Sequence, residues 1–363
     1  MKNSVTFKKF KLLCLLLGVS LSAGLAGCGT ASQNPDQSDA SVSSSSLSEK
    51  SSSSDGLTEV TLGMVPWPAF ELYYLADQQG IFKKNGLKVK IHEFSSTTDN
   101  STAFLGGNLD FCTYASGESI SPYADNQSFK VIMPMDKSNG CEGLIAKKGI
   151  NSIKDLKGKT VASQYCSVDH FLLLTLLDEN GMSQNDINFV DMSIEEAGSS
   201  FVAGQCDAAS IWDPYFTQAK KAGGKVLYDT SENPNLISDI LAASNDMIEN
   251  HPETVQAMVT SIYEAEDYWK SHEDEADEFM AKHLGVSADE FKDEIGGLII
   301  PDPNESKTFF DSSDKKNSWS AVQNKVEKFM NQMGVLSSDI DCADMIDMNF
   351  INGYQPSSET ASS

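Results

Sequence analysis

Short apolar runs alternate with amphipathic segments along residues 57–354 of the 363-residue chain. Short apolar runs bounded by turn-forming residues predict buried strands, and apolar positions that recur every three or four residues predict helices. The expected strands span residues 60–65, 87–94, 110–115, 129–134, 160–163, 187–191 and 208–212. The expected helices span residues 69–79, 169–180, 195–203 and 318–333, with a long helical stretch over 250–284. Strands that alternate with helices in this way are typical of α/β proteins with parallel sheets.

One turn pattern occurs twice and divides the body into two lobes of similar design. The two copies are separated by 97 positions, so that Phe104, Gly107 and Asp110 correspond to Phe201, Gly204 and Asp207. In each copy the glycine permits a tight helix exit, and the aspartate can bond backbone amides at the turn. Because residues 240–244 return the chain to the first lobe, we expect lobe 1 at 57–143 plus 241–354 and lobe 2 at 144–240. Two crossings between lobes suit hinge closure around a ligand.

The N-terminal segment indicates export. Lys8, Lys9 and Lys11 precede an apolar run over 12–17, which is too short to span a bilayer. The segment closes on Leu-Ala-Gly-Cys28, which resembles the bacterial lipobox, in which the cysteine takes a diacylglyceryl group. We therefore expect a signal peptide over 1–27 and a lipid on Cys28. An ordinary signal peptide cut elsewhere, or an uncleaved hydrophobic start, is the alternative.

Two further segments have the composition of disordered chain. Residues 28–56 are rich in serine and almost free of apolar side chains, so they predict a flexible tether between the lipid and the body. The tail over 355–363 is similar.

The charge of the chain limits its partners. Removing residues 1–27 leaves 23 lysines against 52 acidic residues, a net charge of −29. Nucleic acid is therefore excluded as a partner. All 27 basic residues are lysine and none is arginine, so an anionic ligand would have to be held without the planar two-pronged guanidinium. Helix N-termini can do this.

No motif for catalysis or metal binding occurs, and we expect neither a catalytic residue, a metal nor a cofactor. Five cysteines remain in the mature body after Cys28, and no spacing resembles a disulfide framework or a Cys-x-x-Cys metal site. They are Cys112, Cys141, Cys166, Cys206 and Cys342. We expect buried free thiols, with a structural disulfide as the alternative.

Candidate ligand contacts come from the carboxyl ends of strands and from helix starts, where ligands gather in open α/β sheets. The expected ligand-binding residues are Trp67, Tyr114, Ser116, Glu118, Glu142, Ser167, Asp169, His170, Trp212 and Asp213. Aromatic faces and carboxylates together suit an amine or a cationic ring. The structural alternatives are that Trp67 plugs the edge of a lobe, that Asp169 and Asp213 cap helices, and that Glu142 forms a hinge salt bridge.

Several segments, taken in order, resemble a family of solute-binding proteins that serve ATP-driven importers of nitrate, sulfonates and taurine. They lie at residues 63–70, 80–82, 155–161, 168–174, 204–215 and 250–255. The family also contains binders of thiamine-pyrimidine precursors. The resemblance implies an α/β, two-lobed periplasmic-binding-protein-like fold of type II, with two interlobe crossovers and a ligand cleft between the lobes.

The resemblance also implies a function. We expect a monomeric, lipid-anchored protein on the outer face of the cell membrane that captures a small nitrogen- or sulfur-containing nutrient. It would close by a hinge and deliver the nutrient to an ABC permease and its ATPase. An amine or heteroaromatic ligand is slightly preferred over a sulfonate, taurine or nitrate. A surface lipoprotein that binds another macromolecule is the alternative, and an enzyme resembling the pyrimidine synthases is the least favoured.

Overall fold

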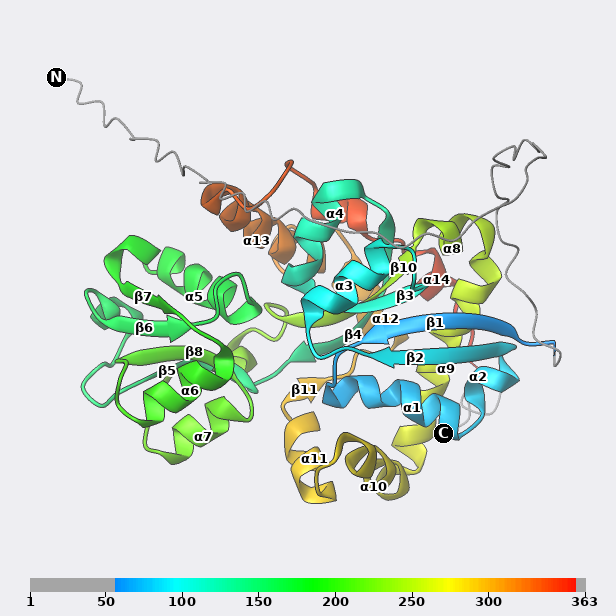
Figure 1. Ribbon diagram of the computed structural model, residues 1–363, viewed down its shortest axis with the longest axis horizontal. Helices are drawn as coiled ribbons and strands as arrows, with labels where there is room; N and C mark the ends of the chain where they lie inside the picture. Colours follow the sequence, from blue (N-terminus) through cyan, green and yellow to red (C-terminus); the bar gives the residue numbers. More distant parts are fainter. Residues whose placement is uncertain (1–55, 357–363) are drawn as a thin grey trace, which may run out of the picture. The chain divides into compact units, whose positions relative to one another are not determined.

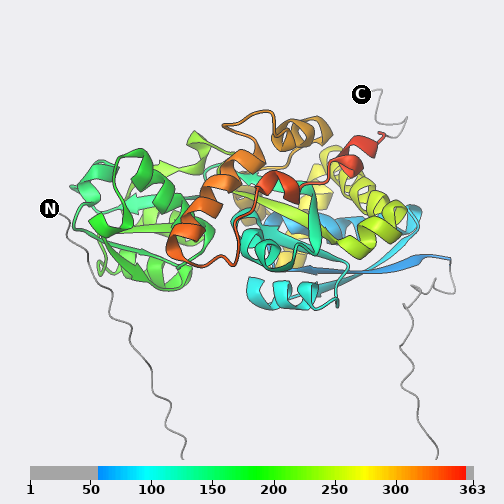
Figure 2. The same ribbon diagram turned by 90° about the horizontal axis from the view of Figure 1, so that it is seen from above.

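The computed structural model describes residues 56–356, which form two mixed β-sheets with helices packed on them (Figures 1 and 2). The expected signal peptide, Cys28, nearly all of the tether and most of the tail lie outside the described residues. No helix in the described part of the chain has the length and apolar character needed to cross a membrane.

The first sheet has six strands and the second has five. The order in the first sheet is β11 (Leu298–Ile299), β4 (Phe129–Ser138), β10 (Ser238–Ser244), β3 (Phe111–Ala115), β1 (Thr58–Met64) and β2 (Leu87–Glu93). The order in the second sheet is β7 (Asn188–Asp191), β6 (Thr160–Ser163), β8 (Ala208–Trp212), β5 (Glu142–Ala146) and β9 (Lys225–Asp229).

Both sheets are mixed, with the expected parallel strands joined by strands that run in the opposite direction. β2, β1 and β3 run parallel, as do β7, β6 and β8. β10 runs antiparallel to β3 and β4, and β5 runs antiparallel to β8 and β9. These reversed strands are the ones by which the chain passes between the sheets. The chain leaves the first sheet on β4 and enters the second on β5, and it returns from β9 to β10.

Helices cover both faces of each sheet. Those that follow strands of the first sheet are α1 (Glu71–Gln78), α2 (Ile81–Lys84), α3 (Thr97–Leu105), α4 (Ile120–Asn126), α8 (Asn245–Asn250), α9 (Pro252–Ser271), α10 (Glu273–Leu284), α11 (Ala288–Ile295), α12 (Pro303–Phe310), α13 (Trp319–Met333) and α14 (Asn349–Gly353). Figure 1 shows α5 (Val168–Glu179) on one face of the second sheet, with α6 (Ile194–Val202) and α7 (Tyr215–Lys221) on the other.

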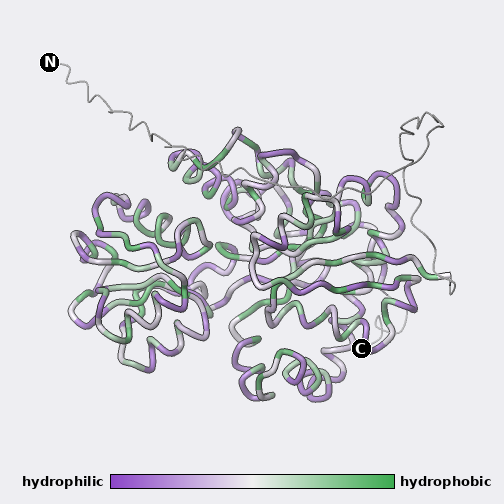
Figure 3. Tube along the Cα trace, in the orientation of Figure 1, coloured by the Kyte–Doolittle hydropathy of each residue, from purple (hydrophilic) through white to green (hydrophobic). Residues whose placement is uncertain are grey.

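Helix α5 is hydrophobic around its whole circumference, and its surroundings explain why. All residues from Val168 to Leu177 are buried. One side of the helix packs on the second sheet, while the other meets α13 and the short 3₁₀ helix Ser116–Ser119 of the first sheet. A helix that is apolar on all sides is stable only when it is enclosed in this way. The hydropathy colouring of Figure 3 likewise shows hydrophobic segments along the strands.

The repeated turn pattern has the same role in both sheets, as predicted. Gly107 and Gly204 both have a φ of 75°. The Asp110 carboxylate accepts the backbone N–H of Thr61 at 2.8 Å, and the Asp207 carboxylate accepts that of Thr160 at 3.0 Å. Each aspartate thus ties the entrance of its own strand to the neighbouring strand β1 or β6. These residues are architectural.

Most of the expected elements occur, with two kinds of difference. The helical stretch over 250–284 is two helices, α9 and α10, which are separated at His272. Strands β5 and β9 were not predicted, because each is a short segment in a region without clear alternation. The strands change sheet between Ser138 and Glu142 and again between Asp229 and Ser238. The lobe boundaries given above stay predictions.

The close packing at Gly143 gives a test of the second sheet. A Cβ on Gly143 would collide with the Tyr228 carbonyl oxygen and would lie 2.6 Å from the Phe216 ring. We therefore expect Gly143→Ala to lower the free energy of unfolding by about 1–3 kcal/mol. The matched control is Gly106→Ala, because Gly106 is in the right-handed helical region and a Cβ there approaches the Thr102 carbonyl at 3.1 Å. Chemical denaturation measures both, and equal losses would contradict the packing.

Candidate functional site

The candidate site is a cavity of about 170 Å³ whose walls come from both sheets. Its lining residues are Val65, Pro66, Trp67, Phe70, Thr97, Thr113, Tyr114, Ala115, Glu118, Glu142, Val168, Trp212, Ile237 and Asp239. Glu142, Val168 and Trp212 belong to β5, α5 and β8, which build the second sheet and its cover. Ile237 directly precedes β10, and the others belong to strands of the first sheet or to the loops and helices that follow them. We call this the central cavity.

Two tryptophans form aromatic walls, and each is held next to an acid. Trp67 follows β1 and directly precedes the short 3₁₀ helix Pro68–Phe70, and its indole N–H donates to the Asp136 carboxylate at 2.8 Å. Trp212 is the last residue of β8 and is the register partner of Glu142 on β5. Each aromatic side chain is therefore positioned by a strand end, which is a rigid support for a ligand contact.

The acids at the central cavity carry oxygen atoms without a hydrogen-bond partner. Glu142 is 4% exposed and lines the cavity, and its Oε2 atom is buried and unpartnered. Oε2 of Glu118, which also lines the cavity, is buried and unpartnered. Both carboxylate oxygens of Asp169 are unpartnered as well, but this residue is fully buried and is not part of the cavity lining. A buried polar group without a partner costs about 1–3 kcal/mol, and a charged one costs more. These oxygens are therefore suited to a ligand that donates hydrogen bonds or carries positive charge.

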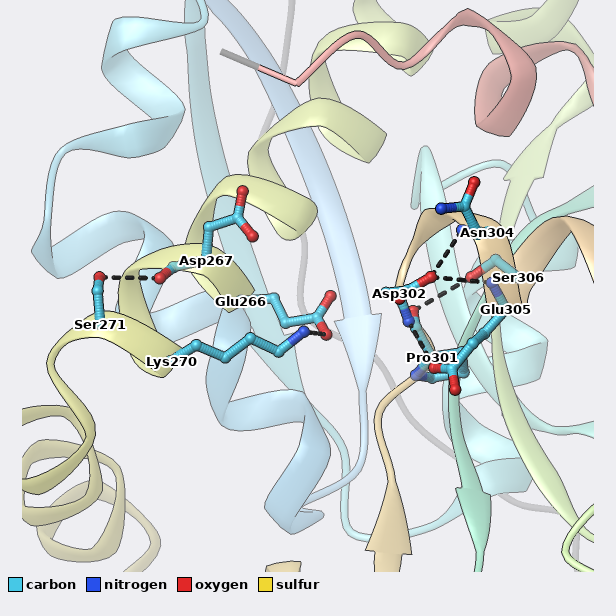
Figure 4. A network of polar contacts seen from close by, with 9 residues as sticks. All are labelled: Glu266, Asp267, Lys270, Ser271, Pro301, Asp302, Asn304, Glu305 and Ser306. Carbon is cyan, nitrogen blue, oxygen red and sulfur yellow. Dashed lines mark hydrogen bonds and ion pairs between the residues drawn. The ribbon is translucent and has the colours of Figure 1, made fainter. Parts of the chain in front are cut away.

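Buried acids elsewhere in the described part of the chain have basic partners. The Glu266 carboxylate accepts a hydrogen bond from the ammonium of Lys270 at 2.6 Å (Figure 4). The Glu71 carboxylate contacts His283 at 2.8 Å, and Asp277 lies 3.5 Å from the ammonium of Lys292. None of the acids at the central cavity has such an ion pair among the described residues. The absence of a basic partner is thus confined to the acids around this cavity.

Burial raises the pKa of the three acids that line the cavity, Glu118, Glu142 and Asp239, and of two buried acids that do not line it, Asp136 and Asp169. It raises the pKa of Glu118 to about 7 and that of Asp136 to about 6, although the hydrogen bond from Trp67 opposes the latter shift. Burial, followed by the charge of Asp169, raises the pKa of Glu142 well above its usual range. Burial raises the pKa of Asp169 in the same way, and burial and the charge of Asp136 raise that of Asp239. Without a positively charged ligand, these groups retain protons that free carboxyl groups would lose.

Five of the ten predicted ligand-binding residues line the central cavity. They are Trp67, Tyr114, Glu118, Glu142 and Trp212. Two others line adjoining cavities. Ser167 faces a cavity of about 360 Å³ that shares Thr97, Tyr114 and Glu118 with the central one. Asp213 faces a cavity of about 310 Å³ that shares Pro66, Trp67 and Trp212 with it.

Ser116 and His170 lie in structural contacts rather than in these three cavities. The Ser116 hydroxyl donates to the Ser238 carbonyl at 2.6 Å and accepts the indole N–H of Trp319 at 2.8 Å. His170 is fully buried, and its ring nitrogens contact the Gln184 side chain at 2.8 Å and the Cys166 backbone N–H at 3.1 Å. Both residues have their polar groups occupied by these contacts, and their role in ligand binding stays a prediction.

The predicted acids Asp213, Asp169 and Glu142 each had a structural alternative, a helix cap for the two aspartates and a hinge salt bridge for Glu142. Asp213 accepts the backbone N–H of Thr217 at 2.7 Å at the start of α7, so it has a capping role besides lining a cavity. The cap of α5 is Ser167, whose hydroxyl accepts from the N–H of His170. Asp169 is therefore not a cap, and its carboxylate is buried beside Glu142. Glu142 forms no salt bridge within the described residues.

Sequence reasoning missed two acids, Asp136 and Asp239. They are register partners on the antiparallel strands β4 and β10, and Asp239 lies opposite Ala115 on β3. Ligand contacts were expected at the carboxyl ends of parallel strands. Because β10 runs antiparallel, its amino end lies beside the carboxyl end of β3. Each of these aspartates lies at the border of an apolar run, and this position is the sequence signal that could have identified Asp136 and Asp239 as site candidates.

The cysteines and the acids offer no second chemistry. The five cysteines of the described chain are free thiols, as expected. Burial raises the pKa of Cys141 and of Cys166, so neither is activated as a nucleophile. Across residues 56–356, no group of three or more His, Cys, Asp or Glu side chains is arranged to hold a metal ion.

Comparison with known proteins places this geometry in a family context. A family model described as NMT1/THI5 like matches residues 67–276, more than half of the chain. The taurine-binding periplasmic protein of Escherichia coli is 26% identical over 189 residues, which cover 51% of this chain and 58% of the relative. A predicted binding protein of Brucella abortus is 28% identical over 218 residues, covering 58% of this chain and 67% of that protein.

Solved structures show the same fold. The periplasmic aliphatic sulphonate binding protein of Escherichia coli matches with a TM-score of 0.68 and 20% identity, over 80% of this chain and 92% of that chain. The desulfurization enzyme DSZB matches with a TM-score of 0.56 and 15% identity, over 81% and 97%. The expected periplasmic-binding-protein fold is thereby confirmed. Because the fold carries both binding proteins and an enzyme, function has to be argued from the site.

The pKa of Glu118 predicts how stability depends on pH. Its folded pKa of about 7 lies above the ordinary value of 4.5, so the folded state binds a proton that the unfolded state loses. The contribution of this proton to the free energy of unfolding is fully present below about pH 4.5 and is lost as the pH rises to about 7. We expect Glu118→Gln to reduce this decline in unfolding free energy by about 1–2 kcal/mol, allowing for its partial exposure.

Thermal unfolding of the ligand-free protein across this pH range measures the effect. Glu59→Gln is the control, because lysines lower the pKa of that exposed acid and its removal should not flatten the decline. An unchanged pH profile in Glu118→Gln would contradict the assignment.

Proposed function

The chain belongs to the NMT1/THI5-like family, and on that premise we propose that it is an extracytoplasmic substrate-binding protein of an ABC importer. Its ligand is a small nutrient with a cationic nitrogen, an amine or a nitrogen heteroaromatic. The lipid expected on Cys28 holds the protein at the outer face of the cell membrane. A permease and its ATPase take the ligand from the closed form.

The observation that carries this proposal is the set of unpaired buried acids facing the central cavity. Glu118 is ionised above about pH 7, and a sulfonate or nitrate about 4 Å from its carboxylate would then be repelled by about 4 kcal/mol at an effective dielectric constant of about 20. The same geometry attracts an ammonium or amidinium by a similar amount, and that group supplies the missing hydrogen-bond donors. The sulfonate and taurine ligands in the names of relatives remain the alternative class.

Capture follows from the two-sided construction of the cavity. Trp67, Glu118 and Asp239 come with the first sheet, whereas Glu142 and Trp212 come with the second. A cation that contacts acids of both sheets gains interactions available only when the sheets approach. Differential contacts of this kind shift a hinge equilibrium toward the closed form.

Two other functions have less support. A protein that binds a macromolecule should expose a large apolar patch. In the described residues the large exposed hydrophobic side chains are Tyr165, Val202 and Val335, and the first and last of these line the cavity shared with Glu118. An enzyme of the pyrimidine-synthase kind would need reactive cysteines, whereas burial raises the pKa of Cys141, the thiol next to Glu142.

A ligand panel tests the proposed class. We expect thermal-shift measurements with amines, aminopyrimidines, taurine, alkyl sulfonates and nitrate to give the largest rise in melting temperature with an amine or aminopyrimidine. The affinity of that ligand should fall as the pH is lowered through about 7, because protonated carboxyl groups bind cations weakly. A rise given by sulfonates or nitrate alone would overturn the cationic class.

A pair of matched substitutions separates binding from stability. Glu142→Gln removes an unpaired buried acid, so we expect at least about a 10-fold loss of affinity together with an equal or higher melting temperature of the ligand-free protein. Glu266→Gln removes an acid paired with Lys270 outside the cavity, so we expect a loss of about 1 kcal/mol in stability with unchanged affinity. Calorimetry and thermal unfolding measure both. Retained affinity in Glu142→Gln would remove this residue from the site.

A further inference from the structure

A second cavity adjoins the central one beyond Glu118, and most of its walls are neutral and polar. It has a volume of about 360 Å³ and shares Thr97, Tyr114 and Glu118 with the central cavity. Its lining side chains with an aliphatic hydroxyl are Thr97, Thr98, Ser101, Thr102, Ser121 and Ser167. Among its described lining residues, Glu118 alone is an acid and none is a lysine. We call it the hydroxyl cavity.

The other adjoining cavity has different walls. It has a volume of about 310 Å³ and is bordered by Trp67 and Trp212, which also line the central cavity. Three prolines, Leu284 and Val286 contribute to its lining, and no serine or threonine is among the described residues that do. The two extensions of the central cavity therefore favour different chemistry. A substituent of the ligand with several hydrogen-bonding groups fits the hydroxyl cavity.

Part of the hydroxyl lining is free to bind a ligand. The Thr102 hydroxyl donates to the Thr98 carbonyl at 2.8 Å, and the hydroxyls of Ser101 and Tyr114 contact each other at 3.0 Å. The hydroxyls of Thr98 and Ser121 have no hydrogen-bond partner in the described part of the chain, and neither residue is buried. A hydroxyl both donates and accepts, so these two groups complement hydroxyls on a ligand.

Glu118 lies where the two cavities meet. Its side chain lines both, and its Oε2 atom is buried without a hydrogen-bond partner. A carboxylate accepts hydrogen bonds from sugar hydroxyls, as does the acid that binds the ribose of dinucleotides. Tyr165 adds an aromatic wall to the hydroxyl cavity, since it is 40% exposed there. Its ring face is suited to pack on the C–H groups of a sugar.

The central cavity has the size and the walls of a site for one flat ring. It holds about 170 Å³, and a cavity of about 150 Å³ can enclose one benzene ring. Trp67, Tyr114 and Trp212 supply aromatic walls. Glu142 supplies a carboxyl group that can pair with the ring nitrogen and the amino group of an aminated heterocycle. A larger substituent has to extend into an adjoining cavity.

We propose that the ligand is of the nucleoside class, with an aminated nitrogen heterocycle in the central cavity and a sugar in the hydroxyl cavity. The inference rests on the proposed binding function and narrows its ligand class. Glu118 accepts hydrogen bonds from sugar hydroxyls near the ring, and Thr98 and Ser121 bond those farther from it. Because the two parts of the ligand occupy cavities of different chemistry, the protein distinguishes the whole molecule from a free base and from a free sugar.

Calorimetry of the full chain with matched probes tests the inference. The probes are cytosine with cytidine, adenine with adenosine, the 2′-deoxy forms of both nucleosides, ribose, 1-aminobutane and taurine. We expect the preferred nucleoside to bind at least about 10-fold more tightly than its own base and than ribose. Loss of one hydroxyl in its 2′-deoxy form should weaken binding by about 3- to 10-fold.

Substitutions in the hydroxyl cavity give a second measurement. Thr98→Val and Ser121→Ala each remove a free hydroxyl, so each should weaken nucleoside binding by about 3- to 10-fold and narrow its advantage over the base. Thr308→Val is the control, because Thr308 lies on α12 outside the three cavities and donates to the Asn304 carbonyl at 2.9 Å. It should leave that advantage unchanged. Thermal unfolding confirms that each variant is folded, and the wild-type probe series is decisive without them.

The outcomes separate this inference from the proposed function. Bases that bind within about 3-fold of their nucleosides would overturn the nucleoside class and leave a receptor for nitrogen heterocycles. Binding of 1-aminobutane without any nucleoside would likewise overturn the inference and leave the proposed function. Binding of taurine alone would overturn both. An absence of binding by both nucleosides would overturn the inference whatever the other probes do.

Discussion

The buried acids without basic partners are the constraint on which this molecule depends. A carboxylate removed from water loses its hydration, and at Glu266, away from the cavity, the ammonium of Lys270 offsets part of that loss. At the central cavity no lysine or histidine of the described residues does so. The ligand-free protein therefore keeps protons on these groups and carries part of their desolvation cost. A ligand that supplies positive charge recovers this free energy, so the same residues that weaken the empty protein provide the affinity.

The strand directions explain how the acids come together. In a parallel sheet the carboxyl ends of all strands lie at one edge, where Trp67 comes soon after β1 and Trp212 ends β8. The returning strand β10 runs the other way, so its first residues enter the same edge and bring Asp239 opposite Asp136. On the second sheet β5 is reversed as well, and its first residue Glu142 lies beside Trp212. The two crossings between the sheets thus also bring Asp239 and Glu142 to the cavity.

Much of this could be predicted from the sequence, because its signals are local. The apolar runs predicted most strands of the two sheets, and the spacing of Asp110 and Asp207 predicted their equivalent roles. The predicted export signal and the lipid on Cys28 concern residues outside 56–356. Half of the predicted ligand contacts line the central cavity because they lie at or near the ends of strands.

The other features of the fold and the site depend on contacts between residues far apart in the sequence, which the hydrophobic pattern does not reveal. Whether β10 runs parallel or antiparallel is set by long-range pairing, and this hid Asp239. The side-chain direction of the first residues of α5 determines that Asp169 points inward and that His170 is held by Gln184. The burial that raises the pKa of Glu142 results from packing between elements distant in sequence. The position of a polar residue at a strand end or helix start therefore does not show whether its side chain is free for a ligand or held in a structural contact.

The most direct test is to identify the molecule that the protein carries when it is isolated. Native mass spectrometry of the full chain, purified from its own cells without denaturation or extensive dialysis, would give the mass of the co-purified ligand, and fragmentation would give its functional groups. The account predicts a small molecule with cationic nitrogen, in a complex that dissociates when the acids are protonated at low pH. A bound sulfonate or another anion without a cationic group would contradict it.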